Sequence, residues 1–129
     1  MNSSRFGGAA GVGGWVELGR TTLGSAADDI TVSSLANKRY YMVLSNKLAT
    51  GNANLVHRVG NGTADSGSNY ARRASTNGGA DGTDVNVTNF HGDNGAASAT
   101  SLTVSHISNL STKEKLHIAH SVGQGTAGA

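Results

Sequence analysis

Apolar and polar residues alternate with a period of two along most of this chain, and no segment carries a sustained apolar period of 3.6 residues. Such alternation places successive side chains on opposite faces of a β-strand. Clusters of glycine, asparagine and aspartate interrupt it and indicate turns. The pattern predicts eight short strands, at residues 15–23, 30–35, 38–48, 55–60, 69–75, 85–90, 100–110 and 114–122.

The strongest apolar run is residues 38–48. Tyr40, Met42 and Leu44 fall on one face of this strand, and Tyr41 and Val43 fall on the other. Because both faces are apolar, we expect it to be a central strand. In the last predicted strand, Leu116, Ile118, His120 and Val122 share one face, whereas Lys115, His117, Ala119 and Ser121 share the other.

Strands at intervals of roughly 10–15 residues are typical of antiparallel sandwiches and jelly rolls. We therefore expect an all-β fold, an antiparallel β-sandwich of jelly-roll type, over residues 15–129. Residues 1–14 are rich in glycine, alanine and serine and predict a flexible N-terminal arm. No apolar run is long enough for a membrane-spanning helix, and we expect no membrane partner.

The composition limits the number of domains, the chemistry and the binding partners that we expect of this protein. The 129 residues suit one domain and include no cysteine, no proline and 19 glycines, and only 14% are charged. Between residues 38 and 73 the sequence has one acidic residue, Asp65, and a larger number of basic residues. The basic residues are Lys38, Arg39, Lys47, Arg58, Arg72 and Arg73. This small excess comes without interleaved aromatic residues, so we expect an acidic protein partner or solvent there rather than nucleic acid.

The histidines do not form a recognisable metal motif. His117 and His120 are three residues apart on one predicted strand, so they point to opposite faces. His106 and His120 fit neighbouring strands on the same face. A zinc site needs three or four converging ligands, so we expect hydrogen-bonded or exposed histidines, His57 and His91 included, and no metal.

The carboxylates favour turn chemistry. Asp81, Asp84 and Asp93 lie in predicted loops that contain glycine, without the spacing of an EF-hand. A calcium ion bound at an interface is the alternative to plain turn chemistry. Glu17 and Glu114 are the only glutamates, and nothing in the sequence pairs them as a glycosidase requires.

No motif indicates catalysis. No serine stands in G-x-S-x-G, and no glycine-rich segment precedes a helix as a phosphate loop would. We therefore expect no enzyme and no cofactor. A sugar platform built on Trp15 and Tyr70 is possible, although aromatic side chains more often pack in cores or interfaces.

The order of several segments resembles a family of small structural proteins of tailed bacteriophages. The matching segments are "GWVELGRTTLGSAADDITVSSLANKRYYMVL", "VHRVGNGTADSGSNYARRASTNGGADGTD" and "ISNLSTKEKLHIAHSVGQGTAGA", which together span roughly residues 14–129. The resemblance implies a virion component of jelly-roll type with no enzymatic activity. It further implies that Arg72 and Arg73 lie on a strand, one across the sheet surface and the other paired with a carboxylate.

On this basis we expect a protein that decorates or cements the capsid through its loops and its N-terminal arm. Its partners would be the major capsid protein or other virion proteins, and it would itself form a dimer or trimer. The expected partner-binding residues are Arg5, Phe6, Trp15, Arg58, Tyr70, Arg72, Arg73, Asp81 and Asp84.

Two alternatives stay open. One is a tail-fibre module that binds host-surface glycan through Trp15, Tyr70, Asp81 and Asp84, and the other is a cellular lectin. The resemblance also implies further strands after Ala129. A sandwich without them has an open edge, which the arm of a neighbouring chain would cover by strand addition.

Overall fold

The computed structural model describes residues 14–93, 99–110 and 115–124. The chain forms two compact units, Met1–Ala36 and Asn37–Ala129. The described part contains seven strands and no helix, so nothing in it is a helix of the length and apolarity that a membrane crossing needs. The protein is therefore all-β, as the alternation of the sequence predicts.

The two strands predicted at residues 15–23 and 30–35 are wrong, because the described residues 14–36 contain no strand. Ser34 has φ 57°, in the left-handed region, and this interrupts the extended backbone that the alternation requires. Thr21 Oγ1 donates a hydrogen bond to the carbonyl of Thr31, which fixes a local loop instead of a strand ladder. Alternation alone was insufficient here, since no partner strand supplies the main-chain hydrogen bonds.

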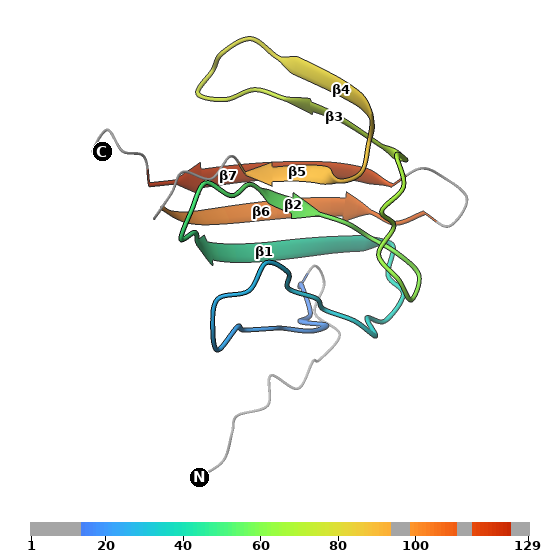
Figure 1. Cartoon of the computed structure of the whole chain (residues 1–129). Helices are drawn as coiled ribbons and strands as arrows, with labels where there is room; N and C mark the ends of the chain where they lie inside the picture. Colours follow the sequence, from blue (N-terminus) through green and yellow to red (C-terminus); the bar gives the residue numbers. More distant parts are fainter. Residues whose placement is uncertain (1–13, 94–98, 111–114, 125–129) are drawn as a thin grey trace. The chain divides into compact units, whose positions relative to one another are not determined.

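The strands of the second unit pair in a nested order (Figure 1). They are β1 (Tyr40–Leu48), β2 (Leu55–His57), β3 (Tyr70–Ala74), β4 (Gly82–Val87), β5 (Phe90–Asp93), β6 (Thr100–Ser108) and β7 (Leu116–Gly123). The innermost pair is β3 with β4, the next is β2 with β5, and the outermost is β1 with β6. β7 adds to the far side of β6, and every pairing is antiparallel.

The central strand of the largest sheet is β6 and not β1. The sheet order is β1-β6-β7, so β1 lies at an edge among the described strands, contrary to the expectation for residues 38–48. The middle row of the sheet consists of Leu44, Val104 and His120, one residue from each strand. Apolar side chains on both faces of β1 therefore did not indicate a central position.

The turn between β3 and β4 has the chemistry that its sequence predicts. Asn77 and Gly78 have φ values of 52° and 72°, and the amide of Gly79 donates to the carbonyl of Thr76 over 2.9 Å. Positive φ at both central residues is the type I′ geometry, which suits a tight hairpin and favours Asn-Gly. Residues 75–81 thus reverse the chain at one end of the β3–β4 hairpin, whereas residues 82–84, Asp84 included, were expected in the turn and instead belong to β4.

The strand β5 was missed, because residues 91–93 were expected in a loop. Phe90 and Asp93 are both buried, and β5 pairs with β2, more than thirty residues earlier in the chain. Gly92 packs so closely that a Cβ there would lie 3.1 Å from the carbonyl oxygen of Leu55. A histidine, a glycine and an aspartate have little strand propensity, so long-range pairing made this strand.

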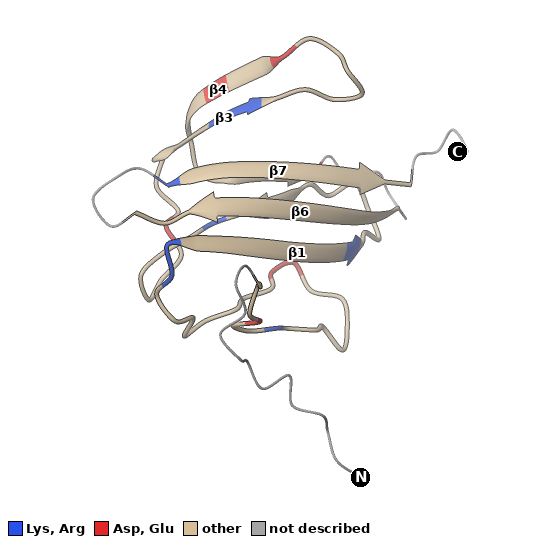
Figure 2. Ribbon diagram, turned by 180° about the vertical axis from the view of Figure 1, so that it is seen from behind, with Lys and Arg blue, Asp and Glu red and all other residues tan. Residues whose placement is uncertain are grey.

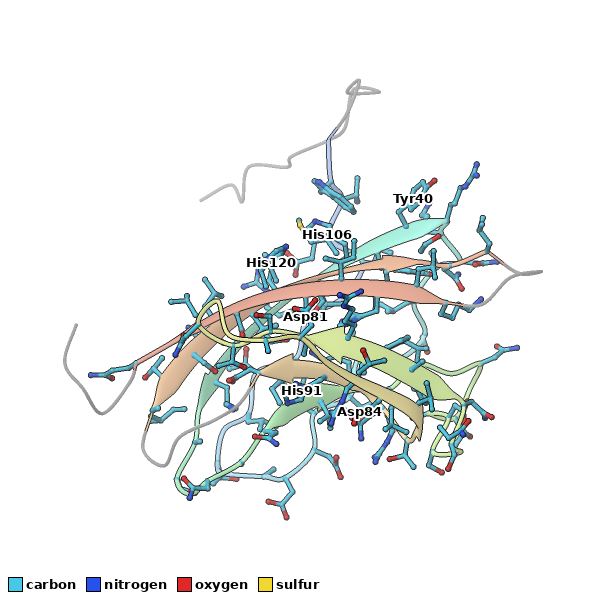
Figure 3. The ribbon with its side chains drawn as sticks, turned by 90° about the horizontal axis from the view of Figure 1, so that it is seen from above. Tyr40, Asp81, Asp84, His91, His106 and His120 are labelled. Atoms are coloured by element: carbon cyan, nitrogen blue, oxygen red, sulfur yellow. The ribbon has the colours of Figure 1, made fainter. Side chains whose placement is uncertain are left out.

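The β2–β5 pair lies against one face of the β1–β6–β7 sheet (Figures 1 and 3). The ring of Phe90 on β5 stacks on His117 of β7, with centroids 4.6 Å apart. Tyr70 of β3 packs edge-on against Phe90 at 4.8 Å. These aromatic contacts join the three sheets of the second unit into one packed body.

Candidate functional site

On the β1–β6–β7 sheet, several small polar side chains are buried, whereas many large apolar side chains are exposed. On β6, Ser101, Thr103 and Ser105 are buried beneath the β2–β5 pair, whereas Leu102 on the opposite face is 46% exposed. Strand residues alternate between faces, so every second residue belongs to the same side. We call the side that carries Thr103 the inner face and the side that carries Leu102 the outer face.

The inner face is made mostly of small or polar side chains. In register across the sheet it carries Tyr41, Val43, Ser45 and Lys47 of β1, Ser101, Thr103, Ser105 and Ile107 of β6, and His117, Ala119 and Ser121 of β7. Small side chains let the second layer approach closely. Their polar atoms must then find partners, since an unpaired buried polar atom is costly.

A histidine–serine cluster lies at the inner face, where His57 of β2 meets Ser105 and His117 of the sheet. His57 Nδ1, from β2, lies 3.4 Å from His117 Nε2 and 3.3 Å from Ser105 Oγ. Burial lowers the pKa of His57. Burial, together with the repulsion of a charged His57, lowers the pKa of His117 to about 4. Both rings are therefore neutral near pH 7, which is the state in which one nitrogen donates and the other accepts.

This cluster has the elements of a nucleophile and a base, but it is closed. The side chain of Ser105 has no exposed surface, so a substrate carbonyl cannot reach its hydroxyl in this structure. The third group is a histidine rather than the carboxylate that orients the base in a serine hydrolase. The cluster stabilises the layer contact between β2 and the sheet.

A second polar cluster closes the other end of the inner face. Lys47 Nζ lies 2.8 Å from Asp93 Oδ2 and donates to the carbonyl of Ala53, and Ser101 Oγ donates to Asp93 Oδ2 over 2.5 Å. Burial would raise the pKa of Asp93, but the hydrogen bonds from Lys47 and Ser101 and the nearby positive charge hold it below its usual value. Asp93 is therefore a buried structural carboxylate on β5, not the loop residue that the sequence predicted.

The outer face carries most of the large apolar side chains of the sheet, and Tyr40, His106 and His120 mark this side in Figure 3. It carries Tyr40, Met42, Leu44, Asn46 and Leu48 of β1, Thr100, Leu102, Val104, His106 and Ser108 of β6, and Leu116, Ile118, His120 and Val122 of β7. Most of its large apolar side chains are exposed; Leu44 is 64% exposed and Val122 is 69% exposed. An exposed apolar area spanning three strands is a feature of interaction sites in soluble proteins.

The outer face carries no lysine, arginine, aspartate or glutamate, and its two histidines are His106 and His120. Figure 2 shows the three strands in tan, with blue only near strand ends. The described basic residues Lys38, Arg39 and Lys115 precede the starts of β1 and β7. Since β1 and β7 both run antiparallel to β6, these residues gather at one end of the sheet.

The two arginines of β3 pair within the chain. Arg72 Nε lies 2.6 Å from Asp84 Oδ2, and Arg73 bonds Asp81 with an Nε–Oδ2 distance of 2.8 Å. The prediction that Arg72 and Arg73 lie on a strand is confirmed, but the expectation that only one of them pairs with a carboxylate is wrong. Because β4 and the turn before it present one aspartate to each arginine, both cations are compensated across the hairpin.

Two other predicted partner-binding residues, Tyr70 and Arg58, make contacts within the second unit. Tyr70 is only 6% exposed, and its hydroxyl donates to the carbonyl of Asp65 over 2.9 Å, so it serves as a core anchor. Arg58 donates to the carbonyl of Thr88. Trp15 is exposed and belongs to the first unit. Arg5 and Phe6 lie outside the described residues.

The histidine predictions can be compared with the register. His117 lies on the inner face and His120 on the outer face, as their spacing predicts. His106 and His120 lie on neighbouring strands and on the same face, also as predicted. Within residues 14–93, 99–110 and 115–124, no three histidine, aspartate or glutamate side chains are grouped so that they would hold a metal ion.

The outer face is the functional candidate that the sequence reasoning missed. The alternation grouped Leu116, Ile118, His120 and Val122 on one face of a strand, but it did not indicate whether that face is buried or exposed. Ser101, Thr103 and Ser105 gave no signal either, because small polar residues that alternate with apolar ones are also typical of a strand whose polar face is exposed to water.

Comparison with known proteins adds no relative. No family model, no curated protein and no solved structure matches this chain.

Proposed function

We propose that this protein is a non-enzymatic structural subunit of a bacteriophage virion, which decorates or cements the capsid. The observation that carries the proposal is the outer face of the β1–β6–β7 sheet, where exposed large apolar side chains gather without any lysine, arginine, aspartate or glutamate. A monomer that keeps such a face in water loses the stabilisation that burial of apolar surface provides, at about 25 cal/mol per Å². A subunit of a large assembly recovers it at a protein–protein contact.

The buried position of the reactive side chains supports an adhesive rather than a catalytic role. Ser105 and His57 form the described serine–histidine contact, and Ser105 is fully covered. The carboxylates Asp81, Asp84 and Asp93 are each compensated by a basic side chain. These side chains stabilise the fold and are not arranged around an open cleft.

The finer fold that we propose is a β-sandwich of jelly-roll type. Nested pairing of β1 with β6, β2 with β5 and β3 with β4 supports it, since a long hairpin folded over on itself produces this order. The β2–β5 pair over the inner face supplies part of a second layer. Jelly rolls are frequent in capsid proteins, which agrees with the resemblance of the sequence to phage structural proteins.

The partners that we propose are the phage major capsid protein or other virion proteins, and further copies of this chain. Repetition on a symmetric shell strengthens attachment, because each added contact becomes intramolecular with a high effective concentration. Modest affinity per copy is then sufficient. The virion is the location that follows from this role.

The glycan-binding alternative receives less support from the geometry. Its candidate contacts were Trp15, Tyr70, Asp81 and Asp84. Tyr70 is buried, and both aspartates accept hydrogen bonds from arginine. A sugar would have to displace these contacts before it could bind.

The experiment that tests the proposed function is quantification of the chain in phage particles purified on a density gradient. We expect this chain to co-migrate with the major capsid protein at a constant ratio across the particle peak. A phage-encoded enzyme of similar mass serves as the control for soluble carry-over. Recovery of this chain only with that control, outside the particle peak, would contradict the proposal.

A further inference from the structure

We infer that the outer face of the β1–β6–β7 sheet is covered by the same face of a second copy, so that two chains form a face-to-face sheet dimer. The inference deepens the proposed function, since it rests on the outer face being an assembly surface. The molecule that covers the outer face is, in this inference, another copy of this chain. The size of the face, its lack of lysine, arginine, aspartate and glutamate, and the basic residues at one end of the sheet support this pairing.

The size of the face suits a dimer contact. Three strands about 4.8 Å apart and eight residues of about 3.4 Å each give a projected area of the order of 400 Å². Projecting side chains such as Leu44, Leu102 and Ile118 raise the accessible area above this value. Two such projected faces give about 800 Å², and the projecting side chains raise the buried area towards the roughly 1,000 Å² that a specific interface needs.

The lack of charge makes the face complementary to itself. In an isologous contact each residue meets the same surface on its partner, so any formal charge near the axis would face its own kind. None of the outer-face residues is a lysine, arginine, aspartate or glutamate, and the two histidines of the face are His106 and His120. A partner chosen by charge would find nothing to pair with here, whereas an identical apolar face buries its side chains without an uncompensated ion.

The geometry of two facing sheets is well defined. Antiparallel sheets pack about 10 Å apart with their strands within about 30° of alignment, and their side chains interdigitate. Val104 is the middle outer residue of the central strand, in the row that also holds Leu44 and His120. A two-fold axis through the centre of the face therefore places Val104 next to Val104 of the second copy.

The basic residues decide the direction of that axis. Lys38, Arg39 and Lys115 lie at one end of the sheet, and Arg39 sits over the ring of Tyr40 at 5.5 Å, close to the outer face. An axis along the strands would place the two basic ends together, whereas an axis across the strands separates them by about 27 Å, well beyond the screening length of about 8 Å.

This arrangement predicts which cysteines cross-link. The chain has no cysteine of its own, so single substitutions report without background. With the axis across the strands, position 104 of one copy lies opposite position 104 of the second copy, so Val104→Cys places two cysteines next to each other. Leu102→Cys is displaced from its own copy by about 14 Å, twice the two-residue rise. Thr83→Cys, on exposed β4, is the matched control off the face.

The test combines cross-linking and sedimentation of the full-length chain. Under mild oxidation we expect Val104→Cys to form a disulfide dimer at least tenfold faster than Leu102→Cys and Thr83→Cys. Sedimentation velocity should find the wild type as a dimer. Leu44→Glu should be a monomer, and Thr83→Glu should remain a dimer; far-UV circular dichroism checks that both variants fold.

Three results would overturn the inference. They are a wild type that is monomeric at every concentration, a Val104→Cys rate no higher than that of Thr83→Cys, and a Leu102→Cys rate equal to that of Val104→Cys. If the wild type is a monomer yet the chain co-migrates with particles, the dimer is wrong while the proposed virion role stands. If the wild type is a dimer but the chain is absent from purified particles, the dimer stands and the proposed virion role is wrong.

Discussion

Leu102 and Thr103 are neighbours on β6 that point to opposite faces of the sheet, and the threonine is the buried one. Thr103 has no exposed surface, whereas Leu102 is 46% exposed. The same inversion runs along β6, where the buried Ser101 and Ser105 alternate with outward apolar side chains. A sheet of this kind has its larger apolar surface on the side that its own second layer does not cover.

The inner face remains stable because its polar atoms are mostly paired. Ser101 bonds Asp93, and Ser105 contacts His57. Two buried side-chain atoms of the described residues, Thr103 Oγ1 and His57 Nε2, have no hydrogen-bond partner among them. Each such atom costs about 1–3 kcal/mol relative to a paired one.

A substitution at Thr103 tests this description of the inner face. Thr103→Val keeps the shape of the side chain and removes a hydroxyl that has no partner, so the free energy of unfolding should stay level or rise by about 1 kcal/mol. Urea unfolding at pH 7 is the measurement. Ser105→Ala is the matched comparison, and it should lower the free energy of unfolding by about 0.5–1.5 kcal/mol because Ser105 contacts His57. Equal losses for both variants would contradict the assignment.

Acid should destabilise the fold through His117. Its pKa is lowered to about 4 by burial and by His57, against about 6.5 in the unfolded chain. A group with a lowered histidine pKa binds protons more readily when unfolded, so its contribution is fully present above pH 6.5 and is lost as the pH falls towards 4. With allowance for partial solvent access, we expect a loss of about 1–3 kcal/mol over this range.

His117→Gln separates this effect from general acid sensitivity. The variant lacks the titrating ring, so its free energy of unfolding should fall less than that of the wild type between pH 7 and pH 4.5. Urea unfolding at several pH values and one protein concentration measures the difference. If both proteins lose the same free energy over this window, His117 does not carry the effect.

The buried ion pair between Lys47 and Asp93 should be sensitive to the loss of one partner. Lys47→Met leaves the carboxylate of Asp93 buried without its cation, which should cost about 3–5 kcal/mol. The double variant Lys47→Met/Asp93→Leu removes both charges and should be more stable than the single variant. Thermal unfolding of the three proteins checks the order. A single variant as stable as the wild type would show that the pair is solvated.

The sequence predicted the parts of the fold that depend on local pattern. The strands β1, β3, β6 and β7 were placed correctly, and the Asn77–Gly78 turn followed from the ability of both residues to adopt positive φ. β5 was not predicted, because Phe90–Asp93 is held by pairing with β2 and by the contacts of Asp93 rather than by propensity. The prediction of strands at residues 15–23 and 30–35 was wrong for the opposite reason, because these segments have strand propensity but no partner strand.

The candidate surface was only half predictable. The period of two correctly grouped Leu116, Ile118, His120 and Val122 on one face. It could not say that this face points outward, because that depends on which layer packs on the other side. In the buried cluster, Ser105 and His117 lie on the consecutive strands β6 and β7, but His57 of β2 is 48 residues from Ser105, and no spacing rule brings it to them.

The dependence of the thermal midpoint on protein concentration tests the central claim most directly. If the outer face is buried between two copies, folding is linked to association, and a hundredfold rise in concentration stabilises the dimer by about 2.7 kcal/mol. The midpoint of the wild type should then rise by several degrees, whereas that of Leu44→Glu should stay constant. A wild-type midpoint that does not change over this range would contradict the account.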